Sequence, residues 1–588
     1  NSAQYRVGEL VISGVRSPRR LVRLPRDLWR LRKELLATHR VAPLAAATDR
    51  PARDIVAATI LDEFSHLALA PEWDQRPLTT GPVGEQLTAI RPALLFVESV
   101  PTIPMVEAAS AAARAQGTPS AFWNTEDPVR FDDFAAAAAS FDWIFTTDAD
   151  SVDRYVRMTG NNKVDVLPFA AQPRVHNPVG APDARLPRAG FAGSWRADVT
   201  ADFDLLLRPA LDVGVLDIFD GMATPGATGA RFPAPYDRAV LGARAYPHLL
   251  DEYRRYSWFL NVNSVKTSPT MCSRRVFELL ACRTPVVSTP SRAIDELLGD
   301  AVITVDTQAD AGAAVERLTT DPEHRDRVGQ RGYRAVMSRH TYGHRVDHVL
   351  GKLGIAAPLR QPRVTVLAPT NRPEFLDPLL DNFTQQRDVD ADLIVLTNSE
   401  RFDRAEVDRR LAAIDGARAI HLAEGLTMGE CLNVGLAATG ARFIAKFDDD
   451  DHYGAYFLHD SLLVHRFVDA AIVGKKTFFA YLEGSDETIV RFPGNEFTAA
   501  NRVSGSTMLI DRSVFPEVRF AALNLGEDID LCEQAAQRGL VVFSADRYNY
   551  VAVRRRDAAS HSWTISEADY RAGSVRVAAG LALDRTMV

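Results

Sequence analysis

From about residue 41, short apolar runs alternate along the chain with Ala- and Leu-rich stretches. This alternation is typical of α/β folding around parallel strands. The apolar runs predict a first series of strands at 93–99, 120–126, 142–148 and 164–170, and a second series at 189–195, 214–220, 257–263, 284–289 and 301–306. Each series is about the size of one Rossmann-like domain, so two such domains are expected in succession.

A third series of strands starts at 363–373 and continues at 391–399 and in "ARFIAKFDDDD". The pattern then changes to mixed strands, as in "AAIVGKKTFFAYLEG" and "RVSGSTMLIDR". A Pro-rich connection, a long helical segment at 321–354 and the linker-like "IAAPLRQP" separate these parts. The predicted organisation is a basic segment 1–40, Rossmann-like domains 41–185 and 186–353, a linker 354–362, and a third α/β domain 363–588.

Length and composition agree with several soluble domains. A chain of 588 residues is too long for one core, and 46% hydrophobic with 24% charged residues is ordinary for a globular protein. A net charge of -8 argues against a nucleic-acid binder, which would carry a basic stripe. No apolar run reaches the roughly 18 residues of a spanning helix. The four cysteines are far apart, and their spacing fits a reducing cytoplasm, where the chain is expected.

The stretch 17–40 is the one strongly basic segment. It holds eight Lys and Arg residues against Asp27 and Glu34, with leucines at helical spacing between them. Such a helix can lie on an anionic membrane surface, which would place the protein at the inner face of the membrane. It can equally be the first helix of a domain with a solvated basic face, which is the reading favoured here.

Four consecutive carboxylates, Asp448 to Asp451, end the apolar run "ARFIAKF". Adjacent carboxylates repel one another, and the end of a half-buried strand makes the repulsion worse. A solvated acidic turn is one explanation. A bound divalent cation is the other, because Mg²⁺ and Mn²⁺ favour carboxylate oxygens.

Further polar residues are expected at the same edge of the sheet. Thr370, Asn371 and Arg372 end one predicted strand, Asn398 ends the next, and Asn433 lies on a helix before the acidic run. In open α/β sheets, ligands bind outside the carboxyl ends of the strands. These side chains are therefore predicted to line one crevice.

The motifs "PTNRP", "LNVGLAATGARFIAKFDDDD", "GSTMLI" and "GEDIDL" resemble, in this order, the family 2 glycosyltransferases of GT-A fold over roughly residues 363–565. The resemblance implies that Asp448 and Asp450 form the DxD pair that binds Mn²⁺ or Mg²⁺. Asp450 is the more direct ligand and Asp451 the alternative. Thr370, Asn371, Arg372, Asn398, Asn433, Asp448 and Asp449 would bind the nucleotide-sugar donor. A bound cation would stabilise the leaving diphosphate as a Lewis acid.

Glu527 and Asp528 open a predicted helix in "NLGEDIDLCEQAAQRG". Carboxylates at a helix start are often mere caps. In the family, however, the Asp of this pair is the general base, so Asp528 is predicted as the base and Glu527 as a residue that positions the acceptor. The transfer would invert the anomeric carbon. His561 resembles a late metal ligand of GT-A enzymes, and Trp563 could stack on a sugar or belong to the core.

The motifs "FWNTEDPVRF" and "RVFELLACRTPVVST" resemble the GT-B glycosyltransferases of spore-maturation (CgeB-like) type, over about 41–352. Such enzymes hold the diphosphate without a cofactor, through helix N-termini and basic side chains. Arg274, Arg275 and Lys266 would contact phosphate, and Glu278 the ribose. Asp127 is either catalytic or a turn residue. Arg283 stands where the family usually has Gly.

Together these features predict a bifunctional glycosyltransferase that builds a cell-surface glycan from nucleotide sugars, with UDP-sugars as the usual donors and a glycan or lipid-linked glycan as acceptor. In one alternative only the GT-A module is active and the GT-B pair is a scaffold. In another the chain is a metal-dependent nucleotide-sugar hydrolase. No nucleic-acid partner is expected.

Overall fold

The computed structural model describes residues 51–588 except 183, 224–228, 357–361 and 558–564. The basic segment 1–40, most of the predicted linker, His561 and Trp563 lie outside the described residues. Two compact units divide the chain between residues 360 and 361, inside the predicted linker. We call them the amino-terminal and the carboxyl-terminal unit and describe each by itself.

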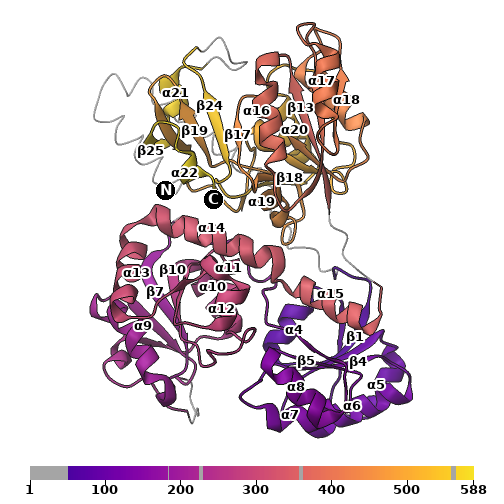
Figure 1. The fold of residues 1–588 in the computed structure, drawn as a ribbon, viewed down its shortest axis with the longest axis vertical. Coiled ribbons are helices and arrows are strands. Elements are labelled where there is room, and N and C mark those ends of the chain that lie inside the picture. The colour runs from indigo at the N-terminus through magenta and orange to yellow at the C-terminus, as the bar shows by residue number, and fades with distance from the viewer. Residues whose placement is uncertain (1–50, 183, 224–228, 357–361, 558–564) are drawn as a thin grey trace, which may run out of the picture. The chain divides into compact units, whose positions relative to one another are not determined.

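The amino-terminal unit contains two parallel six-stranded sheets, each flanked by helices (Figure 1). The first sheet has the order β2-β1-β3-β4-β5-β6 and forms the first lobe. Its strands are β1 (Val56–Ile60), β2 (Asp74–Pro77), β3 (Leu94–Glu98), β4 (Ser120–Asn124), β5 (Trp143–Thr146) and β6 (Val164–Val166). Its helices are α4 (Glu63–Leu69), α5 (Val83–Ile90), α6 (Ile103–Ala115), α7 (Phe131–Ala138) and α8 (Val152–Thr159).

The second sheet has the order β12-β11-β10-β7-β8-β9 and forms the second lobe. Its strands are β7 (Leu186–Gly193), β8 (Leu216–Asp220), β9 (Val240–Gly242), β10 (Tyr256–Asn261), β11 (Val286–Ser288) and β12 (Ile303–Thr304). Its helices are α9 (Thr200–Asp212), α10 (Tyr246–Arg255), α11 (Arg274–Ala281), α12 (Arg292–Leu297) and α13 (Gln308–Thr320). The prediction of parallel, Rossmann-like α/β sheets is confirmed, and the nine predicted strands of the two series all occur.

The long helical segment predicted at 321–354 is two helices, α14 (Pro322–Arg339) and α15 (Tyr342–Leu353). The break falls at Thr341, whose extended backbone and capping box with His344 start a new helix. α15 returns to the first lobe (Figure 1). There Asp347 pairs with the buried guanidinium of Arg53 at 2.6 Å.

The carboxyl-terminal unit is built on a mixed eight-stranded sheet of order β15-β14-β13-β16-β22-β18-β23-β21. Its strands are β13 (Arg363–Thr370), β14 (Asp390–Thr397), β15 (Ala417–His421), β16 (Phe443–Lys446), β18 (Ala470–Gly474), β21 (Thr498–Ala499), β22 (Leu509–Asp511) and β23 (Val541–Ser544). The first four run parallel, and β22 pairs antiparallel with both β16 and β18. The predicted change to mixed strands after the acidic run is thus observed.

A second, five-stranded sheet of the same unit has the order β17-β24-β19-β20-β25. Its strands are β17 (His452–Tyr453), β19 (Phe478–Leu482), β20 (Glu487–Arg491), β24 (Tyr550–Arg554) and β25 (Ser574–Ala579). The helices of the unit are α16 (Leu376–Thr384), α17 (Arg404–Leu411), α18 (Met428–Ala437), α19 (Phe457–Val464), α20 (Glu527–Gln537), α21 (Glu567–Arg571) and α22 (Leu583–Thr586). The turn that holds Asp448 to Asp451 joins β16 of the large sheet to β17 of the small one.

Candidate active sites

Asp449 lies at the carboxyl ends of two adjacent parallel strands, β13 and β16. Its carboxylate accepts a hydrogen bond of 2.5 Å from the Thr370 hydroxyl and two from the Arg372 guanidinium. Burial raises the pKa of Asp449, against the opposing effect of Arg372. The strand ends therefore bring the "PTNRP" and "DDDD" motifs together, as the sequence predicts for one crevice.

Arg372 also reaches the next carboxylate. Its Nη1 lies 3.1 Å from Asp450 Oδ2, and its guanidinium stacks over the Phe375 ring at 4.4 Å. Arg555 lies near the same two groups, at 3.9 Å from Asp450 and 4.1 Å from the centre of the Phe375 ring. Burial lowers the pKa of Arg372, but Asp449 and Asp450 outweigh it and hold the pKa above its usual value. Asp450 thus faces two cations rather than bulk water alone.

Lys446 connects the acidic turn to the helix that carries the predicted base. Its buried ammonium lies 3.1 Å from Asp448 Oδ1 and 3.4 Å from Glu527 Oε1. Burial lowers the pKa of Lys446, but Asp448, Glu527 and Asp528 together raise it above the usual value, so the side chain is a cation. Burial also raises the pKa of Glu527. Lys446 was not predicted from the sequence, although a single charge inside the apolar strand "FIAKF" is a signal for it.

Asp528 sits on the first turn of α20 and faces a short 3₁₀ turn at Gly505–Thr507. A Cβ atom placed on Gly505 would overlap the Asp528 carboxylate. Glycine at 505 therefore makes the room in which the predicted base lies, and the "GSTMLI" motif is brought beside the "GED" motif.

Asp451 turns away from the other three carboxylates. It is 8% exposed, and its oxygens accept hydrogen bonds of 2.6 Å from the Tyr550 hydroxyl and 2.9 Å from the Val553 backbone. Burial, with the nearby charges of Asp450 and Asp448, raises the pKa of Asp451 well above its usual value. These contacts tie the acidic turn to β24, and each Asp451 oxygen already accepts a hydrogen bond.

The three asparagines expected in the crevice have other surroundings. Asn433 exchanges two hydrogen bonds, of 2.8 and 3.0 Å, with the backbone of Phe520, so its amide is occupied in holding a loop. The Asn398 amide donates to the Leu426 carbonyl at 3.3 Å. Asn371 is exposed beside Arg372. Only the last has a side chain that is open to a ligand at this edge.

The carboxylates suited to a divalent cation are Asp448 and Asp450. Their side chains are 33% and 13% exposed, and they sit on either side of the buried Asp449. Within 51–557 and 565–588, apart from the gaps given above, no group of three or more His, Cys, Asp or Glu side chains is arranged to hold a metal. Mg²⁺ does not require such a cage, because it keeps several waters and binds one or two carboxylates together with substrate phosphates. Asp448 and Asp450 fit that mode.

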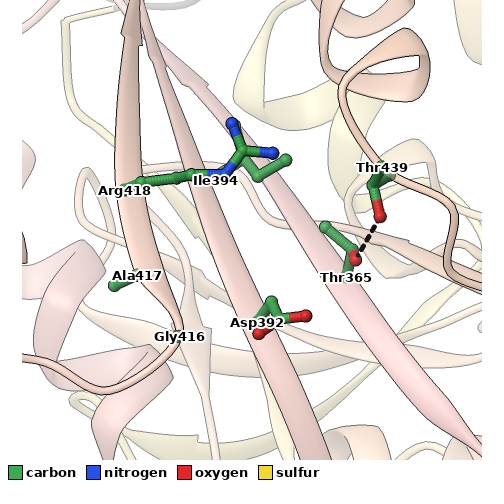
Figure 2. A pocket seen from close by; sticks show the side chains of 7 residues that line it. All are labelled: Thr365, Asp392, Ile394, Gly416, Ala417, Arg418 and Thr439. Atoms are coloured by element: carbon green, nitrogen blue, oxygen red, sulfur yellow. Dashed lines mark hydrogen bonds between the residues drawn. The ribbon is translucent and has the colours of Figure 1, made fainter.

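A separate pocket of about 310 Å³ lies at the opposite, amino-terminal ends of β13 and β14. Its polar groups already have partners. The Thr365 and Thr439 hydroxyls are bonded to each other at 2.8 Å (Figure 2), and Arg418 donates to the Ala438 carbonyl at 2.6 Å. Asp392 is held by Arg363. This pocket is not the predicted crevice, and none of the residues predicted from the sequence lines it.

In the amino-terminal unit, Arg274 and Arg275 begin α11 at the carboxyl ends of the second sheet. The Nη2 atom of Arg275 would lie 3.7 Å from a Cβ placed on Gly193, the last residue of β7. Arg274 points to the first lobe, where its Nη2 is 3.7 Å from Asp62 Oδ2 and 3.9 Å from Glu98 Oε1. Both predicted phosphate-binding arginines therefore face strand ends, where ligands of parallel sheets bind.

Glu278 and Lys266 have partners of their own. Glu278 is 2% exposed and accepts a hydrogen bond of 2.7 Å from the Tyr246 hydroxyl, and burial raises its pKa. Lys266 pairs with Asp202 at 2.6 Å. Glu278 therefore already has one hydrogen-bond donor, Tyr246, and is buried, which leaves its other acceptor sites for any further contact.

Asp127 does not face a cleft. It is fully buried and accepts hydrogen bonds from the Asn124 amide at 2.8 Å and the Thr146 hydroxyl at 2.6 Å. Burial raises the pKa of Asp127 to about 7. The sequence left Asp127 as either catalytic or a turn residue. These contacts favour the structural role, because the carboxylate holds the ends of β4 and β5 together from inside the first lobe.

One family of known proteins matches part of the chain. Residues 224–351, most of the second lobe, match the model of a family described as glycosyl transferase-like. No curated protein matches the chain. The predicted enzyme class, a glycosyltransferase, is confirmed by this match. In the part of the chain that the structure describes, no helix has the length and apolar character needed to cross a membrane.

Several solved structures are similar to part of the chain. The mannosyltransferase PcManGT from Pyrobaculum calidifontis, in complex with GDP-Man and Mn²⁺, is 17% identical over 33% of this chain and 57% of its own, with a TM-score of 0.26. TarS 1-349 of S. aureus, in complex with UDP-GlcNAc, is 17% identical over 35% of this chain and 63% of its own, with a TM-score of 0.28. The chain thus spans less than two thirds of the length of either protein, and similarities at this level assign it no activity.

Proposed function

We propose that the chain carries two sugar-transfer centres, one in each unit, and that both use nucleotide-sugar donors. The observation that carries the proposal is the Lys446 bridge, because it joins the acidic turn and the Glu527–Asp528 helix into one site. A site that only bound a cation would not need this second pair of carboxylates. For the amino-terminal unit, the family match over 224–351 and the two arginines at strand ends support a second centre.

In the carboxyl-terminal centre, Asp448 and Asp450 would hold Mn²⁺ or Mg²⁺ against the donor diphosphate. When bound, the cation stabilises the negative charge of the departing nucleoside diphosphate. Arg372 and Arg555 flank Asp450 and add positive charge on the same side. Asp528 takes the proton of the acceptor hydroxyl as that oxygen attacks the anomeric carbon, which inverts the configuration. Lys446 holds Glu527 by an ion pair. Its positive charge also reduces the repulsion between the carboxylates of the acidic turn and those of the Glu527–Asp528 pair.

In the amino-terminal centre, Arg275 and Arg274 would pair with the donor diphosphate at the start of α11. No cation is required there, because a helix N-terminus and guanidinium groups together neutralise phosphate. Two centres of different chemistry on one chain suit the synthesis of a glycan with two kinds of linkage, such as a cell-surface polymer.

A thermal-shift panel of nucleotide sugars with and without Mn²⁺ tests the proposal, since a ligand that binds the native state raises Tm. At least one nucleotide sugar should raise Tm only when Mn²⁺ is present. Asp450→Ala should abolish this Mn²⁺-dependent shift and leave any Mn²⁺-independent shift unchanged. A control variant, Asp415→Ala, removes an exposed carboxylate of the same unit and should respond as the wild type does. If no nucleotide sugar shifts Tm under either condition, the proposal is wrong.

A further inference from the structure

Glu98 is the last residue of β3, at the carboxyl end of the first sheet. It is 1% exposed, and its oxygens accept hydrogen bonds of 2.9 Å from the Thr125 hydroxyl and 3.0 Å from the Asp62 backbone N–H. The carboxylate also reaches the second lobe, where Arg274 Nη2 lies 3.9 Å from its Oε1. The position is one at which parallel sheets bind ligands.

The second lobe presents Arg274 to this carboxylate. The guanidinium is covered by the rings of Phe64 and Phe169, whose centres lie 5.2 and 4.8 Å from its central carbon. Its Nη1 is buried and has no hydrogen-bond partner among the described residues, and the same is true of the Tyr342 hydroxyl. The charge of Arg274 acts on Tyr342, so the two groups are neighbours. Buried polar groups nearly always find a partner, and these two unpaired atoms indicate that a polar ligand completes the site.

The charges around Glu98 suit proton transfer near neutral pH. Burial and the charge of Asp62, before α4, raise the pKa of Glu98, whereas Arg274 of α11 and the hydrogen bond from the Asp62 backbone lower it. The net effect raises the pKa to about 7. General bases work best with a pKa near the operating pH.

We propose that Glu98 is the general base of the amino-terminal centre and that its substrate is a sugar hydroxyl of a glycan acceptor. The inference rests on the proposed function of this unit as a transfer centre. The acceptor hydroxyl gives its proton to a Glu98 oxygen while its own oxygen bonds to the anomeric carbon of the donor. The bond from that carbon to the diphosphate breaks, and its electron pair leaves with the nucleoside diphosphate, which Arg274 neutralises. The anomeric configuration is inverted, and the substrates replace the contact between Glu98 and Arg274.

Neither neighbouring carboxylate suits this role as well. Asp62 caps α4, because its Oδ1 accepts a hydrogen bond of 2.6 Å from the Ser65 backbone. Asp127 is enclosed within the first lobe by Asn124 and Thr146. Glu98 lies at a strand end and faces a predicted phosphate-binding arginine, and unlike Asp62 it caps no helix.

The test uses the full chain with Asp528→Asn, which silences the carboxyl-terminal base, and compares Glu98→Gln with Glu107→Gln, an exposed glutamate on α6. The probes are UDP-GlcNAc, GDP-mannose and other nucleotide sugars with a panel of short glycans, and the readouts are transfer rate, product mass and UDP affinity. Glu98→Gln should lose roughly 10²- to 10⁴-fold in kcat. Glu98→Gln should keep its UDP affinity. In the parent kcat/KM should fall below pH 7, and in Glu98→Gln this fall should be absent. Glu107→Gln should match the parent.

Transfer by Glu98→Gln within about threefold of its parent overturns the inference while the proposed function stands. A parent without any transfer overturns the proposed second centre itself, and the inference falls with it. Glu98→Asp guards against misfolding, because it keeps the carboxylate. It should fold, transfer slowly and keep the acid limb of the pH profile, and a pH profile without that limb contradicts the assignment.

Discussion

Lys446 Nζ lies 3.4 Å from Glu527 Oε1, and this buried contact joins residues 81 positions apart in the chain. One partner ends the strand before the acidic turn, and the other opens the helix of the predicted base. The two halves of the carboxyl-terminal centre therefore depend on one ammonium group, and this dependence can be measured.

Lys446→Met should destabilise the protein by about 3–5 kcal/mol, because it leaves the buried Glu527 and the partly exposed Asp448 without a counter-ion. Arg363→Met is the matched control, since it breaks an ion pair with Asp392 in which the arginine is 58% exposed. Exposed pairs contribute only about 0–1 kcal/mol. Urea unfolding of both variants measures the difference. Equal losses would show that Lys446 is not the link described here.

Asp528→Asn should lower the rate of Mn²⁺-dependent transfer by roughly 10²- to 10⁴-fold, because the amide keeps the shape but cannot accept the proton. Donor binding should persist, since the phosphates are held by other residues. Initial rates and calorimetric titration with UDP and Mn²⁺ check the two halves of this prediction. A variant that transfers sugar at nearly the wild-type rate would remove Asp528 from the role of base.

Gly505→Ala should impair the same step without changing any ionisable group. Its new methyl group would overlap the Asp528 carboxylate and push it out of place. Gly440→Ala is the control, because a Cβ at 440 meets no atom within 4 Å. We expect the first variant to lose transfer while keeping donor affinity, and the second to behave as the wild type. A fully active Gly505→Ala would mean that Asp528 need not occupy the observed position.

Asp127 should make stability fall as the pH rises. Its native pKa of about 7 lies above the ordinary value of about 4, so between these values the unfolded chain binds fewer protons than the native state. The stabilisation is complete below pH 4 and lost as the pH rises through 7, with an upper limit of about 4 kcal/mol. Unfolding by urea at pH 5 and pH 8, followed by Trp fluorescence, should show this loss in the wild type. Asp127→Asn should show a smaller loss, and an unchanged one would contradict the assignment.

Much of the fold follows from local patterns. Buried strands such as Leu94–Glu98 and Val286–Ser288 are fully apolar or nearly so, and turn residues bound them on both sides. β1, β2 and β9 were not among the expected strands. β2, Asp74–Pro77, is half exposed and carries no apolar pattern, and β9 is only three residues long, whereas β1 is an apolar buried run that was overlooked. The break between α14 and α15 has a local signal too, in a threonine that caps the second helix.

The site was harder to predict than the fold. The acidic run and the Glu527–Asp528 pair can be found from sequence because each is a continuous motif. The contacts of Asn433 with Phe520, and of Glu98 with Arg274, join residues far apart in the chain, so no spacing rule finds them. The contact with Arg274 distinguishes Glu98 from the equally buried Asp127, and this contact depends on the packing of both lobes.

The most direct test of two transfer centres is the mass of the products made from pairs of nucleotide sugars and a short glycan acceptor. Wild type should give a polymer, while Asp450→Ala, or EDTA with the wild type, should stop after one kind of sugar. Arg275→Met should stop after the other kind, and a mixture of the two variants should restore elongation. If Arg275→Met elongates the glycan as wild type does, the amino-terminal unit is not a second centre, and the chain does not carry two.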